Sequence, residues 1–127
     1  MKPITREWVE KAEGDFATAR RELDVRIDPN YEAVCFHSQQ CVEKLLKARL
    51  QEADISFPKT HDLTVLLDLL LSMHPEWERL RSNLHALTAF AVGYRYPGES
   101  SDELEAREAV EICQSVRSLA RSALGLE

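Results

Sequence analysis

Apolar residues recur at intervals of three and four along most of the chain, which is the spacing of one face of an α-helix. Val9, Ala12 and Phe16 follow this spacing and predict a first helix over about 5–23, with the hydroxyl of Thr5 as the expected N-cap. No segment shows the alternation of apolar and polar residues that indicates a β-strand. The pattern therefore predicts an all-α protein.

A second helix is predicted from Asp28-Pro29 to about residue 53, since Asp caps helices well and Pro suits the first turn. Its apolar arc comprises Val34, Cys35, Cys41, Val42, Leu45, Leu46 and Ala48. Its polar arc comprises His37, Gln40, Glu43, Lys44, Lys47 and Gln51. Because a helix that is apolar over half its circumference packs between other helices, we expect the polar arc to face water, a groove or a binding partner.

A short third helix is predicted over about 61–72, with Thr60 as its cap, and a fourth restarts at His74-Pro75. After a break near Pro97-Gly98, the spacing of Ser100 and Glu103 predicts a capping box that starts a fifth helix. The connections are short and no repeat or second composition appears. We therefore expect a single domain over residues 1–127, built as an up-and-down bundle of about five helices.

The formal net charge of -6 excludes a surface that attracts nucleic acid as a whole, so we expect no DNA binding and only local contacts with phosphate. Three cysteines are too few for a disulfide framework and favour a reducing compartment. No apolar run approaches the roughly 20 residues that span a bilayer, and the first residues do not form a signal peptide. We therefore expect a cytoplasmic protein with no membrane contact.

Motifs for metal or nucleophilic chemistry are absent from the sequence. The four histidines, at 37, 61, 74 and 85, form no pair at i and i+4, and no CxxC occurs. There is also no G-x-S-x-G nucleophile motif and no glycine-rich phosphate loop. We therefore expect no metal and no cofactor other than a nucleotide ligand.

The segment around Arg95 is the strongest candidate for ligand chemistry. Arg95 lies between Tyr94 and Tyr96, and a guanidinium flanked by aromatic rings is suited to binding phosphate and stacking on a base. The alternative is that Arg95 simply ends a helix and stabilises its last carbonyl groups. The sequence alone leaves both interpretations open.

A polar column at helical spacing leads to Arg95. It comprises Arg81, His85, Thr88, Val92 and Arg95, and it predicts either a groove or the solvent side of a helix. His61, in the expected first turn of the third helix, is a second candidate. The positive end of the helix dipole disfavours added positive charge there, so we expect a neutral imidazole that makes a buried polar contact.

Three segments together resemble the HEPN domain family (higher eukaryotes and prokaryotes nucleotide-binding). Residues 36–48 resemble its F-H-x-Q-Q-x-x-E-K-x-L-K-A helix, and residues 57–63 resemble its P-x-T-H-D-L segment. Residues 87–98 resemble its L-T-x-Y-A-V-x-x-R-Y-P-G segment. The resemblance implies an all-α bundle in a cytoplasmic bacterial or archaeal protein, often encoded beside a minimal nucleotidyltransferase.

Many proteins of the family are metal-independent ribonucleases that act as toxins. That activity uses an Arg, an adjacent polar residue and a His about four to six residues later, which supply a cation and acid–base groups. In this chain Tyr96 follows Arg95, and no His occurs after it. Arg79 and His85 have a suitable spacing, but Leu80 follows Arg79 and the pair precedes the matching segment.

The resemblance without its ribonuclease motif leads to one main hypothesis. We expect a non-catalytic or weakly catalytic module that binds a nucleotide and a minimal nucleotidyltransferase in a toxin–antitoxin-like pair. The expected binding residues are His37, Gln40, Lys44, Lys47, His61, Tyr94, Arg95 and Tyr96. The alternative is a metal-independent ribonuclease that acts on RNA with Arg95 and a spatially adjacent His61 or His85. The aromatic residues Trp77, Phe90 and Tyr94 predict self-association as a homodimer or larger homo-oligomer.

Overall fold

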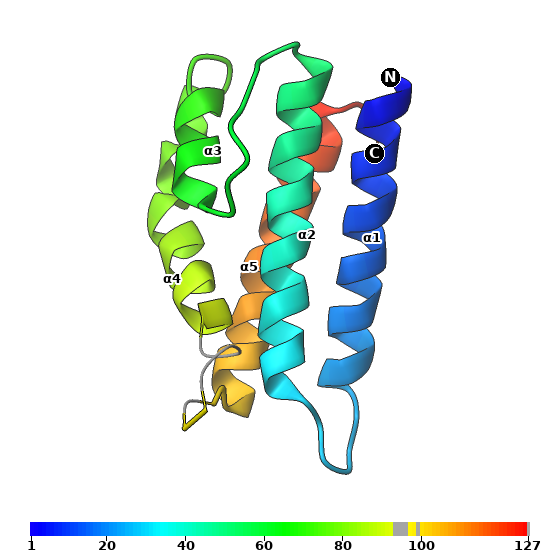
Figure 1. The fold of residues 1–127 in the computed structure, drawn as a ribbon, viewed down its shortest axis with the longest axis vertical. Helices are drawn as coiled ribbons and strands as arrows, with labels where there is room; N and C mark the ends of the chain where they lie inside the picture. The colour runs from blue at the N-terminus through cyan, green and yellow to red at the C-terminus, as the bar shows by residue number, and fades with distance from the viewer. Residues whose placement is uncertain (93–96, 99, 127) are drawn as a thin grey trace.

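The computed structural model of the chain describes residues 1–92, 97–98 and 100–126, and these contain five α-helices and no strand (Figure 1). The helices are α1 (Pro3–Leu23), α2 (Tyr31–Glu52), α3 (Leu63–Leu70), α4 (Arg81–Val92) and α5 (Glu103–Ala123). A 3₁₀-helix, η1 (Pro75–Leu80), leads directly into α4. The prediction of an all-α bundle of five helices is confirmed.

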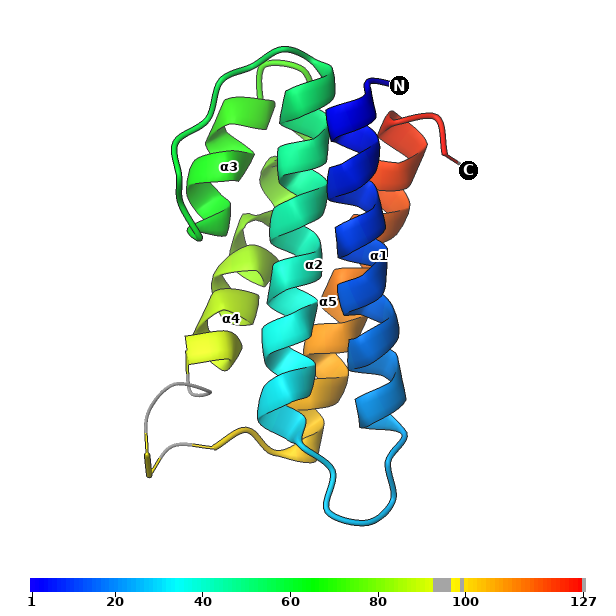
Figure 2. The ribbon, with the colours of Figure 1, turned by 45° about the vertical axis from the view of Figure 1, so that its right-hand side comes forward.

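Helix α2 is the centre of the bundle, because it packs against each of the other four α-helices. Figures 1 and 2 show α1 and α2 side by side and antiparallel, α5 behind them, and α3 and α4 together on the other flank of α2. No helix in the described part of the chain is both long and apolar enough to cross a membrane.

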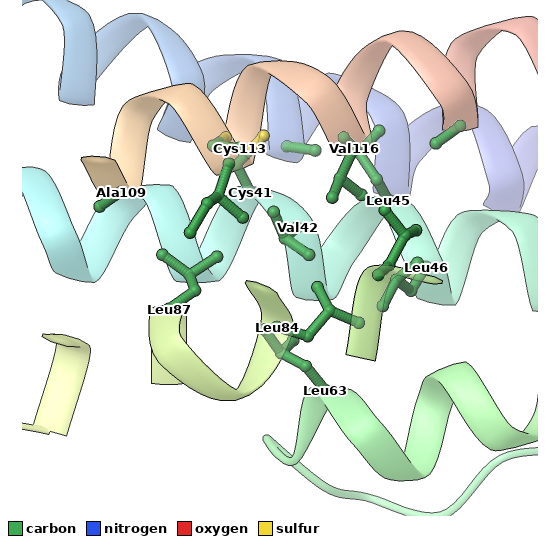
Figure 3. Packing of buried hydrophobic residues seen from close by; sticks show 14 of the residues in the cluster. Cys41, Val42, Leu45, Leu46, Leu63, Leu84, Leu87, Ala109, Cys113 and Val116 are labelled. Carbon is green, nitrogen blue, oxygen red and sulfur yellow. The ribbon is translucent and has the colours of Figure 1, made fainter. Parts of the chain in front are cut away.

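The predicted apolar arc of α2 is fully buried. Cys41, Val42, Leu45 and Leu46 have no exposed surface, and Figure 3 shows them lying between α5 and the flanking pair α3 and α4. Their partners in the core include Leu63, Leu84, Leu87, Cys113 and Val116. The burial follows from the clamped position of α2, as the sequence pattern predicts.

Charged side chains join α1 to α5. Glu13 accepts hydrogen bonds from Arg117 Nε and Nη2 at 2.6 and 2.9 Å, and from Arg121 Nη1 at 2.6 Å. Partial burial alone would raise the pKa of Glu13, but the hydrogen bonds and charges of the two arginines lower it below the ordinary value. The Arg117 guanidinium also lies 4.6 Å from the centre of the Phe16 ring, so it packs as well as pairs.

The predicted starts of α1 and α2 are wrong by two or three residues. Pro3 occupies the first turn of α1, so Thr5 lies inside the helix, where it is buried, and does not cap it. At α2 the side chain of Asn30 accepts a hydrogen bond from the backbone N–H of Ala33 at 3.0 Å. Asp28 lies before this cap, in the left-handed backbone region with φ +52°.

The predicted caps of α3 and α5 also lie two residues too early. Asp62, not Thr60, caps α3, and the capping box of α5 is formed by Asp102 and Glu105 instead of Ser100 and Glu103. In each case a carboxylate a short distance along the chain takes the role expected of a hydroxyl. Helix α3 also ends at Leu70, two residues before its predicted end.

Of the aromatic residues expected to drive self-association, Trp77 is buried. Trp77 lies in η1, is 3% exposed and stacks on His74 with ring centroids 4.0 Å apart. Phe90 is half-buried and packs against the core. Tyr94 lies outside the described residues. Trp77 therefore belongs to the core and offers no surface to a second copy.

Candidate functional site

A hollow of about 470 Å³ lies where α2, the start of α3 and α4 meet. Its lining residues are Phe36, Gln39, His61, Asp62, Thr64, His85, Thr88 and Ala91. A second hollow shares Thr64 and His85 with the first and is otherwise lined by Glu78, Arg79, Arg81 and Ser82. The candidates His61 and His85 are far apart in the sequence. In the structure they lie on one surface, formed by the two hollows.

His61 is held on α2 by a buried carboxylate. Its Nδ1 lies 3.0 and 3.1 Å from Glu43 Oε1 and Oε2, and Glu43 is 4% exposed at its side chain. The His61 side chain itself is 72% exposed. The expected polar contact with a buried group is therefore present, but the imidazole stands at the surface and its other edge faces outward.

The side-chain amide of Gln39 also holds the connection between α2 and α3, which contains His61, against α2. Gln39 Nε2 donates to Glu43 Oε1 at 3.2 Å and to the backbone carbonyl of His61 at 3.1 Å. Gln39 Oε1 accepts a hydrogen bond from Gln40 Nε2 at 2.8 Å. Both amide hydrogens of Gln39 are engaged within the protein, and Gln40, which contacts Gln39, does not itself line the hollow.

Lys47 completes the network around Glu43 but does not line the hollow. Its Nζ lies 2.9 Å from Glu43 Oε2, and the residue is only 7% exposed. The rings of Trp8 and Phe57 cover it, with centroids 5.5 and 6.0 Å from Nζ. The expectation that the polar arc of α2 faces outward is therefore wrong for Glu43 and Lys47, because α1 and the connection after α2 close over them.

Two further side chains of the predicted polar arc join α2 to α1. His37 Nδ1 and Lys44 Nζ lie 2.8 and 2.6 Å from the two carboxylate oxygens of Asp15 in α1. Neither side chain lines either hollow. His37, Lys44 and Lys47, all predicted as binding residues, thus make contacts within the bundle.

Asp62, the residue after His61, also lines the hollow. Thr64 donates to Asp62 Oδ1 from its hydroxyl at 2.7 Å and from its backbone N–H at 3.0 Å. The Thr64 hydroxyl is the main cause of a lowered pKa at Asp62, and the charge of His85 adds to the same direction. The site therefore holds a carboxylate that stays ionised, close to an imidazole.

The two arginines of the second hollow differ in their availability. Arg81 donates to both Glu78 oxygens, at 2.6 and 2.9 Å, and to Asp68 at 2.5 Å. Arg79 is exposed and makes no ion pair within the described part of the chain. Arg79 is therefore the cation beside His85 that an anionic ligand can engage.

Tyr94, Arg95 and Tyr96, the strongest candidates from the sequence, lie outside the described residues. Ala91, four positions before Arg95, lines the hollow. No cluster of three or more metal-ligating side chains occurs among the residues that are described.

Known proteins share both the sequence pattern and the fold of this chain. The family model described as HEPN domain matches residues 5–123. The chain belongs to the HEPN family. Two solved structures are similar to this HEPN chain: TT1696 from Thermus thermophilus and ST0689, titled an archaeal HEPN homologue. No curated protein gives a significant match.

The first structure has a TM-score of 0.75 and 24% identity, and the match covers 94% of this chain and 97% of the other. The second has a TM-score of 0.70 and 26% identity, with 96% and 98% covered. The likeness therefore extends over nearly the whole length of all three chains.

The residues that sequence reasoning missed are Gln39 and Asp62. Gln40 was the predicted binding residue, yet its neighbour Gln39 lines the hollow. A signal was present, because Gln39 and Glu43 lie in one HEPN motif and His61 and Asp62 in another. The sequence does not show that the two motifs meet in space. The hydrogen bonds of Gln39 and Glu43 with His61 show that they do.

Removing the charge of Lys47 should destabilise the HEPN fold. In Lys47→Met the Glu43 carboxylate stays buried without its cation, so we expect a loss of about 3 kcal/mol in the free energy of unfolding. The double variant Glu43→Gln, Lys47→Met should recover most of this loss. Denaturant unfolding measures both, with Lys59→Met, at an exposed position, as the control. A single variant as stable as the wild type would contradict the role given to this pair.

Proposed function

We propose that this HEPN protein is a nucleotide-binding module that works with a minimal nucleotidyltransferase in a toxin–antitoxin-like pair. The observation that carries the proposal is the pair of joined hollows. One combines an aromatic and an apolar side chain with imidazoles, hydroxyls and a carboxylate, and the other adds the guanidinium of Arg79, which has no ion pair among the described residues. Mostly preformed hollows with a few convergent polar groups are typical of small-molecule sites.

The parts of a nucleotide match the two hollows in order. Phe36 and Ala91 offer the first hollow an apolar lining suited to a base. Arg79 in the second hollow offers a planar guanidinium suited to phosphate. His85 lines both hollows and lies between the two ends. Arg95 follows α4 in sequence, and we propose that it is a further phosphate ligand.

Binding without catalysis is favoured by the sequence around Arg95. The ribonuclease pattern of the family needs a His after the Arg, and this chain has none. A cation without the paired acid–base group can bind phosphate but supplies only part of what cleavage requires.

Nucleotide binding should depend on Arg79. We expect ATP or GTP at millimolar concentration to raise the melting temperature of the wild type. Arg79→Ala should weaken the affinity about tenfold, because a charge-assisted hydrogen bond to phosphate is lost. Arg6→Ala, at an exposed position on α1, should bind like the wild type. Calorimetric titration measures the affinities, and unchanged melting with every nucleotide would overturn the proposal.

The partner is proposed from family membership. We expect the protein to co-purify with a minimal nucleotidyltransferase encoded beside it, and to self-associate as a homodimer in its absence. Co-expression with a tag on one protein, followed by light scattering, gives both results. Failure of the two proteins to co-elute, with this chain monomeric, would refute this part of the proposal while leaving nucleotide binding intact.

Ribonuclease activity is a second candidate, favoured by the convergence of His61 and His85 on one hollow. In metal-free cleavage, one imidazole takes the proton of the 2′-hydroxyl as its oxygen attacks phosphorus. The other imidazole gives a proton to the departing 5′-oxygen, leaving a 2′,3′-cyclic phosphate and a 5′-hydroxyl. Arg79 or Arg95 would stabilise the charge on the phosphorane.

A chelator-treated RNA assay decides between the two candidates. If the ribonuclease is real, His61→Ala and His85→Ala should each reduce the rate at least about a hundredfold, the usual contribution of an acid–base group. His37→Ala removes a histidine that lines neither hollow and should leave the rate unchanged. Cleavage that survives both substitutions would belong to a contaminant.

A further inference from the structure

We infer that the part of the first hollow lined by His61 and Asp62, here called the His61 end, selects a ligand that carries hydrogen-bond donors. These donors are the two hydroxyls of a ribose. The hollow would therefore prefer ribonucleotides to nucleotides that lack the sugar diol. This inference rests on the proposed nucleotide binding, and it adds the feature of the ligand by which His61 and Asp62 would recognise it.

Glu43 sets the tautomer of His61. An ionised carboxylate accepts hydrogen bonds but donates none, so the contact of Nδ1 with Glu43 places the imidazole proton on Nδ1. In the neutral ring Nε2 is then an acceptor. Among the described residues Nε2 has no hydrogen-bond partner, and His61 lines the hollow. Glu43 thus presents a fixed acceptor to whatever occupies this end.

Three of the polar side chains that line the hollow already use their hydrogen-bond donors within the protein. Both amide hydrogens of Gln39 point to Glu43 and to the carbonyl of His61. The Thr64 hydroxyl donates to Asp62, and the Thr88 hydroxyl donates to the carbonyl of Leu84 at 3.0 Å. These polar side chains around the hollow therefore leave mainly acceptor lone pairs for a ligand.

Asp62 adds to this excess of acceptors. Thr64 occupies Oδ1, and an exposed carboxylate has room for further hydrogen bonds on its second oxygen. A phosphate group, which carries negative charge and accepts hydrogen bonds, is disfavoured beside an ionised Asp62. A vicinal diol carries two O–H donors and no charge, so it matches both Nε2 of His61 and the carboxylate of Asp62.

The tautomer can be tested without any ligand. In ¹⁵N-labelled protein at pH 8.5, we expect the imidazole signals of His61 to show a protonated Nδ1 and an unprotonated Nε2. His61→Asn assigns the signals by removing them. A protonated Nε2 on His61 at that pH would overturn the inference, whether or not nucleotides bind.

The sugar preference is tested with ATP and 2′,3′-dideoxy-ATP, which differ only in the two hydroxyls. We expect the wild type to bind ATP about tenfold more tightly, since a tenfold ratio corresponds to about one net hydrogen bond. His61→Asn keeps an amide donor toward Glu43 but has no atom at Nε2. Asp62→Asn keeps the cap of α3, because Asn caps as well as Asp.

Each of these two variants should reduce the preference for ATP at least threefold. His37→Asn changes a histidine that is likewise held by a carboxylate but lies outside the hollow, and it should keep the full preference. Equal binding of the two nucleotides by the wild type would overturn the sugar preference and leave nucleotide binding standing. Binding of neither nucleotide would overturn the proposed function and this inference together.

Discussion

The geometry of the hollow depends on the buried carboxylate of Glu43. A carboxylate that is removed from water is strongly disfavoured unless a cation and hydrogen-bond donors replace the solvent. Lys47 provides the cation, and Gln39 and His61 provide the donors. His61 belongs to the connection between α2 and α3 and not to α2 itself. Its contact with Glu43 therefore holds this connection against the side of α2.

The connection between α2 and α3 positions the residues that line the hollow. With His61 on Glu43, the next residue, Asp62, stands where its side chain caps α3, and the first turn of α3 becomes a wall of the hollow. On the other side, Phe57 from the connection and Trp8 from α1 cover Lys47. The ion pair thus ties α1, α2 and the start of α3 together, and the same contacts that stabilise the fold orient the imidazole of His61.

The burial of the apolar arc of α2 could be predicted from the sequence because it follows helical spacing alone. The burial of Glu43 and Lys47 could not, since a charged pair at i and i+4 usually lies on a solvated helix face, and Trp8, which covers Lys47, is far away in the sequence. The cap of α3 was misplaced for a related reason. Asp is intrinsically a somewhat better N-cap than Thr, and Asp62 also directly follows His61, which contacts α2.

Charge and hydrogen-bonding groups are distributed unevenly over the two hollows. The chain carries a net charge of -6, so long-range attraction does not gather anionic ligands. Two carboxylates hold Arg81, whereas Arg79 in the second hollow has no ion pair within the part of the chain that the structure describes. Around His61 and Asp62 the hollow offers mainly hydrogen-bond acceptors, and the ionised carboxylate of Asp62 disfavours a phosphate there. In the proposed nucleotide site, selection among phosphate-bearing ligands would therefore come from the hydrogen bonds that a ligand can donate to His61 and Asp62.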